Sequence, residues 1–259
     1  MQDWAKDILN VEVSRYYSFV ADDLKVLCVI PARGGSKSIP KKNLRKLAGK
    51  PLVAWPIEAA LNCNLVTEVV CSSDSDEILS FAKSMGSNIH KRPQHLATDE
   101  ADSPPVVLDV IEKYEKEGEH FDYVIMLEPT SPLTDSTDLT FAINCLEQNS
   151  ENFDSLVTIA ESVSAHPDFT FSLLDDRSLV SINQAHWKVK RRQDISKLYF
   201  IEGTLYLSKV VTFKKSIAFV QNRTMGMTVA REKSFEIDEE LDFYLLEAIM
   251  KYQEVKKGG

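Results

Sequence analysis

The hydrophobic positions of the chain follow two alternating patterns. Short continuous apolar runs are typical of strands buried on both faces of a parallel sheet, and they predict strands at residues 26–31, 68–71, 88–91, 123–127 and 155–159. Between these runs, apolar residues recur on a helical period, which predicts helices at residues 52–63, 76–85, 103–114 and 136–146. This alternation predicts an α/β fold with a mainly parallel sheet that helices cover on both faces.

The alternation stops after residue 160. Residues 162–197 are polar and irregular, and they include the basic run Lys188, Lys190, Arg191 and Arg192. Strand-like segments follow at 199–207 and 217–220, and a final helix is expected at about 239–255. We therefore expect one domain over residues 25–259, preceded by an N-terminal extension over residues 1–24. An arm at about 162–209 is inserted in this domain and serves as a lid or in oligomerisation.

Composition and charge exclude several classes of protein. The chain has 259 residues, 44% of them hydrophobic, and a net charge of −9, which argues against a surface that binds nucleic acid. No apolar run approaches the roughly 20 residues that a membrane span needs, and charges interrupt residues 1–24 too often for a secretory signal. The four cysteines lie far apart without a C-x-x-C pair, which favours reduced thiols. We expect a cytoplasmic protein that binds neither nucleic acid nor membrane.

The segment that follows the first predicted strand is strongly basic. Residues 32–50 carry seven cations and no acid: Arg33, Lys37, Lys41, Lys42, Arg45, Lys46 and Lys50. Ligands of α/β sheets bind beyond the carboxyl ends of the strands, and the glycine pair at 34–35 allows the backbone N–H groups to approach an anion. This combination favours a nucleoside triphosphate, although a solvated basic loop is the alternative. The chain lacks both G-x-x-x-x-G-K-[ST] and G-x-G-x-x-G, which disfavours a P-loop kinase and a dinucleotide-binding dehydrogenase.

Six motifs along the chain carry a family resemblance. They are IPARGGSKSIPKKNL at 30–44, SSDSDEI at 72–78, RPQHLATDEADS at 92–103, EPTSPL at 128–133, RRQD at 191–194 and EIDEELDF at 236–243. In this order they resemble the acylneuraminate cytidylyltransferases, which include the CMP–sialic acid synthetases and the bacterial enzymes for legionaminic and pseudaminic acids. The resemblance covers about residues 25–250, nearly everything except the N-terminal extension.

The resemblance implies a fold and an activity. The fold is a Rossmann-like nucleotidyltransferase fold with a mainly parallel sheet and a small arm for dimerisation. The activity is the transfer of CMP from CTP to a nonulosonic acid, with release of pyrophosphate and dependence on Mg²⁺. It further implies a homodimer, or a tetramer, in which the arm helps to complete the neighbouring site. The alternatives are transfer to 3-deoxy-manno-octulosonate and a catalytically silent nucleotide-binding protein.

The same resemblance implies roles for individual residues. It assigns catalysis to Arg33, Lys42 and Asp238, and a metal ion to Asp238 and Glu236. The nucleotide is assigned to Arg33, Gly34, Gly35, Ser36, Lys37, Lys42, Asn43, Arg92 and Ser103. The acceptor sugar is assigned to Glu128, Thr130, Ser131, Arg192, Gln193 and Glu202. Glu128 and Glu202 replace the Gln and Asn that the family commonly has, which predicts an acceptor that carries different substituents or an amine.

Several of these residues have simpler interpretations. In an extended segment Glu236 and Asp238 point the same way and can share one ion, but Asp238 also precedes a helix whose N-terminus acids favour. Ser103 precedes two prolines and is a good helix N-cap. Arg92 has the alternative role of a surface cation, and the basic run at 188–192 that of a solvated charged stretch. No residue is identified as a general base.

Overall fold

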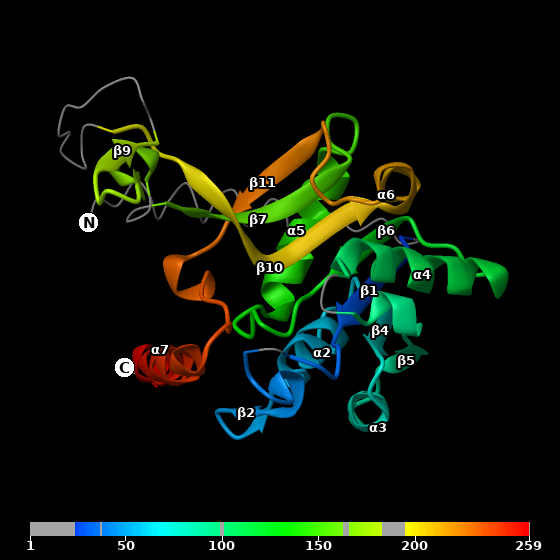
Figure 1. Cartoon of the computed structure of the whole chain (residues 1–259). Helices are drawn as coiled ribbons and strands as arrows, with labels where there is room; N and C mark the ends of the chain where they lie inside the picture. The colour runs from blue at the N-terminus through cyan, green and yellow to red at the C-terminus, as the bar shows by residue number, and fades with distance from the viewer. Residues whose placement is uncertain (1–23, 37, 99–100, 163–165, 183–194, 259) are drawn as a thin grey trace.

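The computed structural model describes residues 24–36, 38–98, 101–162, 166–182 and 195–258. Of the predicted N-terminal extension, only Leu24 falls within these ranges. The central sheet of the described chain has seven strands in the order β11-β7-β10-β6-β1-β4-β5 (Figure 1). Their bounds are β1 Val26–Pro31, β4 Glu68–Ser73, β5 Asn88–Lys91, β6 Tyr123–Met126, β7 Ser155–Glu161, β10 Tyr199–Lys209 and β11 Thr224–Thr228.

The sheet is parallel except at one strand. Parallel pairs join β1 to β4 and β6, β4 to β5, and β7 to β11, whereas β10 runs antiparallel to both β6 and β7. The sheet therefore includes the last part of the range that the sequence assigned to the arm. The expected Rossmann-like nucleotidyltransferase fold with a mainly parallel sheet is confirmed.

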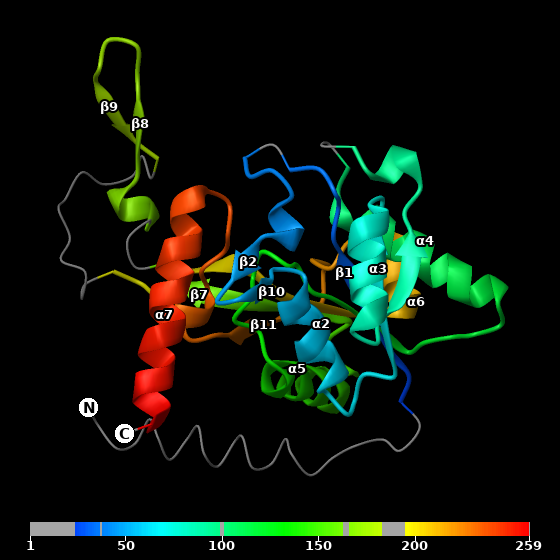
Figure 2. The same ribbon diagram turned by 90° about the horizontal axis from the view of Figure 1, so that it is seen from below.

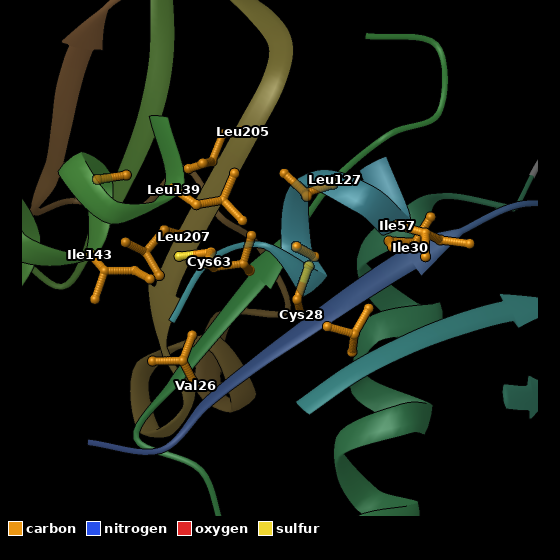
Figure 3. Close-up of a cluster of buried hydrophobic side chains, with 14 of the residues drawn as sticks. Val26, Cys28, Ile30, Ile57, Cys63, Leu127, Leu139, Ile143, Leu205 and Leu207 are labelled. Atoms are coloured by element: carbon orange, nitrogen blue, oxygen red, sulfur yellow. The ribbon is translucent and has the colours of Figure 1, made fainter. Parts of the chain in front are cut away.

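Helices cover both faces of the sheet because its strands are apolar on both sides. Val26, Cys28 and Ile30 of β1 face one core cluster, and the alternate residues Leu27 and Val29 face another. The first cluster, shown in Figure 3, packs α2 (Ala54–Leu61), α3 (Asp76–Ser84) and α5 (Ser136–Gln148) against the sheet. The second cluster packs α4 (Ser103–Lys116) and α6 (Val210–Ser216) against the opposite face.

A third cluster attaches the end of the described chain to its beginning. Ile39, Leu47 and Leu52 pack against Ile237 and against Phe243, Leu246 and Met250 of α7 (Glu240–Gly258). In Figure 2, α7 lies beside the small hairpin of β2 (Lys46–Leu47) and β3 (Lys50–Pro51). The segments at the two ends of the motif series are therefore neighbours in the fold.

The strand predicted at residues 217–220 is wrong. Residues 210–216 form α6, which ends at Ile217 in the left-handed region with φ of 49°, and the next strand is β11. Val210, Phe213 and Phe219 pack into the α4 face of the core, whereas Val211, Ile217 and Val220 are exposed, so the apolar run does not correspond to a buried strand.

The predicted arm contains a hairpin that projects away from the sheet (Figure 2). It consists of β8 (Phe171–Leu173) and β9 (Leu179–Ser181), which pair antiparallel between β7 and β10 in the chain order. The basic run at 188–192 lies outside the described residues. Within the described residues, no helix has the length and apolar character that crossing a membrane requires.

Candidate active site

A cavity of about 390 Å³ lies at the carboxyl ends of the parallel strands. This is the edge at which open α/β sheets bind their ligands. Its walls come from segments that follow β1, β5 and β6 and from the segment that precedes α7. The predicted site residues that line it are Arg33, Gly35, Ser36, Lys42, Asn43, Arg92, Ser103, Glu128, Thr130 and Asp238.

The other predicted residues have different positions. Gly34 and Ser131 adjoin wall residues in the chain without lining the cavity. Gly203, which follows Glu202, donates its N–H to Glu236, and a Cβ at this glycine would lie 3.1 Å from Ser131 Oγ. Lys37, Arg192 and Gln193 lie outside the described residues. Ser38 also lines the cavity, although the sequence analysis did not single it out.

The turn after β1 is attached to β4 by its backbone. The Ala32 N–H donates to the Ser72 carbonyl (2.9 Å), and the Gly34 N–H donates to Asp74 Oδ1 (2.7 Å). The Gly34 donor is therefore satisfied by Asp74. A Cβ at Gly34 would lie 2.8 Å from the Cβ of Ser75, whereas a Cβ at Gly35 would meet nothing within 4 Å. The two glycines thus differ: Gly34 permits close packing, and Gly35 leaves the cavity wall open.

Lys42 connects the basic turn to the acidic motif near the C-terminus. Its ammonium donates to the Ile237 carbonyl (2.8 Å) and lies 3.6 Å from Asp238 Oδ1. The Ile237 N–H in turn donates to the Thr130 carbonyl (2.9 Å). The Asn43 side-chain amide donates to the Arg33 carbonyl (2.8 Å), which fixes the path of the turn. Three motifs that are far apart in the sequence therefore meet around Ile237.

Arg92 is a buried cation on the cavity wall. Its side chain is 7% exposed, and Nη2 donates to the Ser72 carbonyl (2.9 Å). Among the described residues, its buried Nε has no hydrogen-bond partner. Burial lowers the pKa of Arg92, while the Asp74 carboxylate acts in the opposite direction. An unsatisfied buried donor is costly, and a ligand acceptor reaches this N–H group only if the cavity wall rearranges. Arg92 is therefore not a surface cation.

The acids of the motif at 236–243 have different surroundings. Asp242 Oδ2 accepts the backbone N–H groups of Asp238 (2.8 Å) and Glu239 (2.7 Å), so this residue of the first turn of α7 holds the segment that leads into the helix. The Asp238 side chain is 76% exposed and faces the cavity. The Glu236 carboxylate instead accepts the Gly203 N–H, and Ile237 between the two acids is fully buried. Of the two acids, only Asp238 lines the cavity.

The donor chemistry of this wall fits a magnesium ion. Mg²⁺ prefers oxygen ligands and commonly takes one or two carboxylates, with the rest supplied by phosphates and water. Asp238 offers carboxylate oxygens beside the cations of the basic turn. No group of three or more His, Cys, Asp or Glu residues within the described chain is arranged to hold a metal ion by itself.

Glu128 lies between the cavity and the more deeply buried acid Glu202. Its Oε1 accepts the Ser103 hydroxyl (3.3 Å), so the Ser103 side chain is used at the cavity. Ser103 is the first residue of α4, and the capping position belongs to Asp102. Burial raises the pKa of Glu128, and the nearby Glu236 carboxylate acts in the same direction.

Glu202 and Ser131 lie beneath the cavity wall, each only 2% exposed. Thr204 donates its hydroxyl to one carboxylate oxygen of Glu202, while the other oxygen and the Ser131 hydroxyl have no partner in the described chain. Burial raises the pKa of Glu202. Because of this burial, direct contact of either side chain with a ligand in the cavity requires a rearrangement of the wall.

Two contacts that support the site have no signal in the local sequence. Arg45 forms an ion pair with both carboxylate oxygens of Glu240 and lies 4.2 Å above the ring of Phe243. These residues are 195 or more positions apart in the chain, so no motif spacing connects them. The pair joins the basic turn to the first turn of α7.

The sheet, its helices and the cavity at its carboxyl edge define an α/β protein of the Rossmann-like nucleotidyltransferase class. Residues 27–257 match the sequence profile of the family described as cytidylyltransferase, and the chain belongs to this family.

Individual relatives agree with this assignment. The chain is 32% identical over 222 residues to an N-acylneuraminate cytidylyltransferase of Streptococcus agalactiae, which covers 85% of this chain and 52% of the relative. It is 36% identical over 184 residues to a pseudaminic acid cytidylyltransferase of Campylobacter jejuni, which covers 71% of this chain and 78% of the relative. The chain thus spans about half the length of the N-acylneuraminate cytidylyltransferases that it matches.

A solved structure shows the same fold. The CMP:2-keto-3-deoxy-manno-octonic acid synthetase in complex with CTP superposes with a TM-score of 0.62 at 16% sequence identity. The match covers 88% of this chain and 99% of the other. This likeness concerns the architecture alone.

Proposed function

We propose that this protein transfers CMP from CTP to a nonulosonic acid, with release of pyrophosphate. The observation that carries the proposal is the meeting of the first and last motifs: Lys42 Nζ lies 3.6 Å from Asp238 Oδ1 on the wall of one cavity. The relatives named for N-acylneuraminate and pseudaminic acid cytidylyl transfer support the acceptor class.

We assign different cavity residues to different parts of CTP. Nucleotidyl transfer needs positioning of the reactants and stabilisation of the charge on phosphate more than covalent assistance from the protein. Arg33 and Lys42 supply positive charge at the turn that follows β1, and we assign the triphosphate to them. We assign the base and ribose to Arg92 and Ser103, because both line the cavity.

Asp238, assisted by Glu236, is the candidate holder of Mg²⁺. When bound, this ion neutralises charge on the reacting phosphates. The protein's own contribution is to fix the Asp238 backbone through the Asp242 carboxylate and to place the Asp238 carboxylate opposite Lys42. Glu236 is held by the Gly203 N–H behind Asp238, so we assign it a supporting role.

We place the acceptor sugar beside Glu128 and Thr130. Both line the same cavity as Asp238, and the acceptor hydroxyl has to approach the α-phosphate within that cavity. Glu128 differs from the amide that the family commonly has, and burial favours its protonated form, which is the form that resembles an amide donor. Ser131 and Glu202 lie beneath this region, and Arg192 and Gln193 remain predictions outside the described residues.

The test is pyrophosphate release from CTP and Mg²⁺ with a panel of acceptors. Release with N-acylated nonulosonic acids supports the proposal, whereas release only with 3-deoxy-manno-octulosonate identifies the alternative acceptor. Tight CTP binding without release with any acceptor identifies a silent nucleotide-binding protein. Lys42→Met is expected to abolish release, and Lys46→Met, which removes an exposed cation of the same basic segment, provides the matched control.

We further propose a homodimer formed through the arm. The β8–β9 hairpin exposes large apolar residues: Leu173 is 68% exposed, Leu179 54% and Ile182 57%. Leu173 and Leu179 are cross-strand partners, so they form one continuous apolar surface. Replacing both leucines by Asp is expected to convert the dimer to monomers in sedimentation velocity. An unchanged sedimentation coefficient would contradict this assignment.

We also propose that the protein is located in the cytoplasm. The four cysteines are all free and buried, which fits a reducing compartment. CTP is the substrate of the proposed reaction, and the protein would use it where nucleotides are made.

A further inference from the structure

A buried histidine joins two strands of the sheet to the helix that covers them. His90 of β5 is 6% exposed, and its Nδ1 lies 3.0 Å from the hydroxyl of Ser72 on β4. Its Nε2 lies 3.1 Å from Asp109 Oδ2 on α4. Ser72 is fully buried, and the Asp109 side chain is 33% exposed. The three side chains therefore form one chain of hydrogen bonds from the helix surface into the sheet.

The chemistry of the partners fixes the proton positions. An ionised carboxylate only accepts hydrogen bonds, so His90 Nε2 carries the proton and donates to Asp109. Nδ1 is then an acceptor, and the Ser72 hydroxyl donates to it. In this arrangement the neutral imidazole satisfies both neighbours.

Ser72 is the common anchor of two segments of the cavity wall. Its carbonyl accepts the Ala32 N–H (2.9 Å), which holds the turn that begins with Arg33. The same carbonyl accepts Nη2 of Arg92 (2.9 Å), whose own backbone N–H donates to Ser73. A displacement of Ser72 therefore moves both the basic turn and the buried guanidinium.

Asp109 connects a third segment of the cavity wall, the start of α4, to the same anchor. It belongs to α4, whose first residue, Ser103, lines the cavity and donates to Glu128. The bond to His90 therefore ties the helix carrying Ser103 to the strand carrying the Ser72 anchor. Ser72, His90 and Asp109 do not themselves line the cavity.

We propose that Asp109 and His90 are positioning residues for the nucleotide, acting through Ser72 on Arg92, the turn after β1 and α4. This inference rests on the proposed function, because it assigns CTP to that cavity. Its consequence is that loss of the Asp109 contact weakens CTP binding without removing any group that touches CTP.

The charge state of His90 gives the proposal a second observable. Burial lowers the pKa of His90, the cations Lys113 and Arg92 act in the same direction, and Asp109 opposes them. Protonation at low pH would turn Nδ1 into a donor, which the Ser72 hydroxyl then has to accept. CTP affinity is therefore expected to fall on acidification by more than the titration of CTP itself explains.

The first experiment measures the Kd of CTP with Mg²⁺ by calorimetry, using the full chain. Asp109→Ala is expected to raise this Kd about tenfold, the effect of losing one hydrogen bond to a charged group. The kcat at saturating CTP should stay within about twofold of the wild-type value, because the groups assigned to catalysis are unchanged. Asp109→Asn keeps an acceptor and should restore most of the affinity. Glu112→Ala removes an exposed acid from the same helix and is the matched control with an unchanged Kd.

The second experiment compares the pH dependence of CTP binding in the wild-type protein and in His90→Gln. Gln has one donor and one acceptor but gains no proton on acidification, whereas His90 gains one below the ordinary value of about 6.5, because burial lowers its pKa. The wild type should lose more affinity than the variant on acidification. Identical pH profiles would overturn the role of His90, and equal CTP affinities for Asp109→Ala and Glu112→Ala would overturn the role of Asp109.

The failure of this inference is distinguishable from the failure of the proposed function. A wild-type protein that neither binds CTP nor releases pyrophosphate with any acceptor contradicts the proposed function. A wild type that does both, together with an Asp109→Ala variant that loses thermal stability at unchanged Kd, leaves the function intact and contradicts only the positioning role.

Discussion

The two adjacent glycines of the basic turn offer a matched test of structure against binding. In Gly34→Ala, the new Cβ lies 2.8 Å from the Cβ of Ser75, well inside the roughly 3.5–4.0 Å of a normal carbon contact. Neither Gly34 nor Gly35 has a φ in the left-handed region, so alanine adds no backbone strain at either position. The difference between the two variants therefore reports packing and space alone.

The contact at Gly34 has no easy route to relaxation. Ser75 is the N-cap of α3 and accepts the Ile78 N–H, so the helix resists movement on that side. The turn must move instead, which lengthens the 2.7 Å bond from the Gly34 N–H to Asp74. Overpacking of this kind costs about 1–3 kcal/mol. We therefore expect Gly34→Ala to lower the free energy of unfolding by about this amount and to weaken CTP binding as the turn shifts.

Gly35→Ala is expected to behave in the opposite way. Its Cβ meets nothing within 4 Å, so the unfolding free energy should stay the same or rise by up to about 1 kcal/mol through the restricted unfolded chain. Because Gly35 lines the cavity, the added methyl group occupies space that we assign to phosphate. The Kd of CTP should therefore rise without loss of stability.

Urea unfolding and calorimetric CTP titration of both variants measure these effects. A thermal scan gives a second reading, at about 2–4 °C for each kcal/mol in a chain of this size. Equal stability of Gly34→Ala and the wild type would refute the packing argument. Unchanged CTP affinity in Gly35→Ala would refute the placement of the phosphates.

Three further substitutions test the acids. Asp238→Ala should abolish pyrophosphate release while changing the unfolding free energy by less than about 0.5 kcal/mol, because its side chain is 76% exposed; near-normal turnover at saturating Mg²⁺ would exclude the metal role. Asp242→Ala should lower the free energy of unfolding by about 0.5–1.5 kcal/mol in urea unfolding, because the two backbone N–H groups that lead into α7 lose their acceptor; an unchanged midpoint would contradict this. Glu128→Gln should change the KM of the acceptor but not the Kd of CTP. Burial raises the pKa of Glu128, so the carboxyl group becomes protonated at a higher pH than usual. The acceptor KM of the wild type and of the Gln variant should therefore converge as the pH is lowered, and a constant difference would contradict this.

Much of the sheet was predictable because its strands are buried on both faces. The first five residues of β1, Val26 to Ile30, each pack into one of the two clusters, so the strand is apolar and stands out as a run. The same signal failed at residues 217–220, because a short apolar run does not distinguish a strand from other buried segments. Phe219 is buried in a loop beside α6, and that helix, with only seven residues, is too short for a clear period.

The position of the site was predictable, but the role of each acid was not. Motifs that follow parallel strands must gather at one edge of the sheet, which places Arg33, Arg92 and Glu128 on one cavity. Alternation along an extended segment also placed Glu236 and Asp238 on the same side. Which carboxylate remains available depends on Gly203, which contributes an N–H to Glu236 from a different strand. No pattern within the acidic motif contains that information.

The site is formed only when the segments near both ends of the described chain are docked together. Lys42 and the Ile237 carbonyl are 195 positions apart, and the apolar cluster beneath them packs Ile39 and Leu47 against Phe243 and Leu246. Detachment of α7 would therefore remove Asp238 from the cavity and leave Lys42 without its partner, while the central sheet keeps both of its own core clusters. A ligand that binds across this junction stabilises the docked form by mass action. CTP with Mg²⁺ should accordingly protect α7 from hydrogen exchange more than it protects β1, although β1 leads directly into the site.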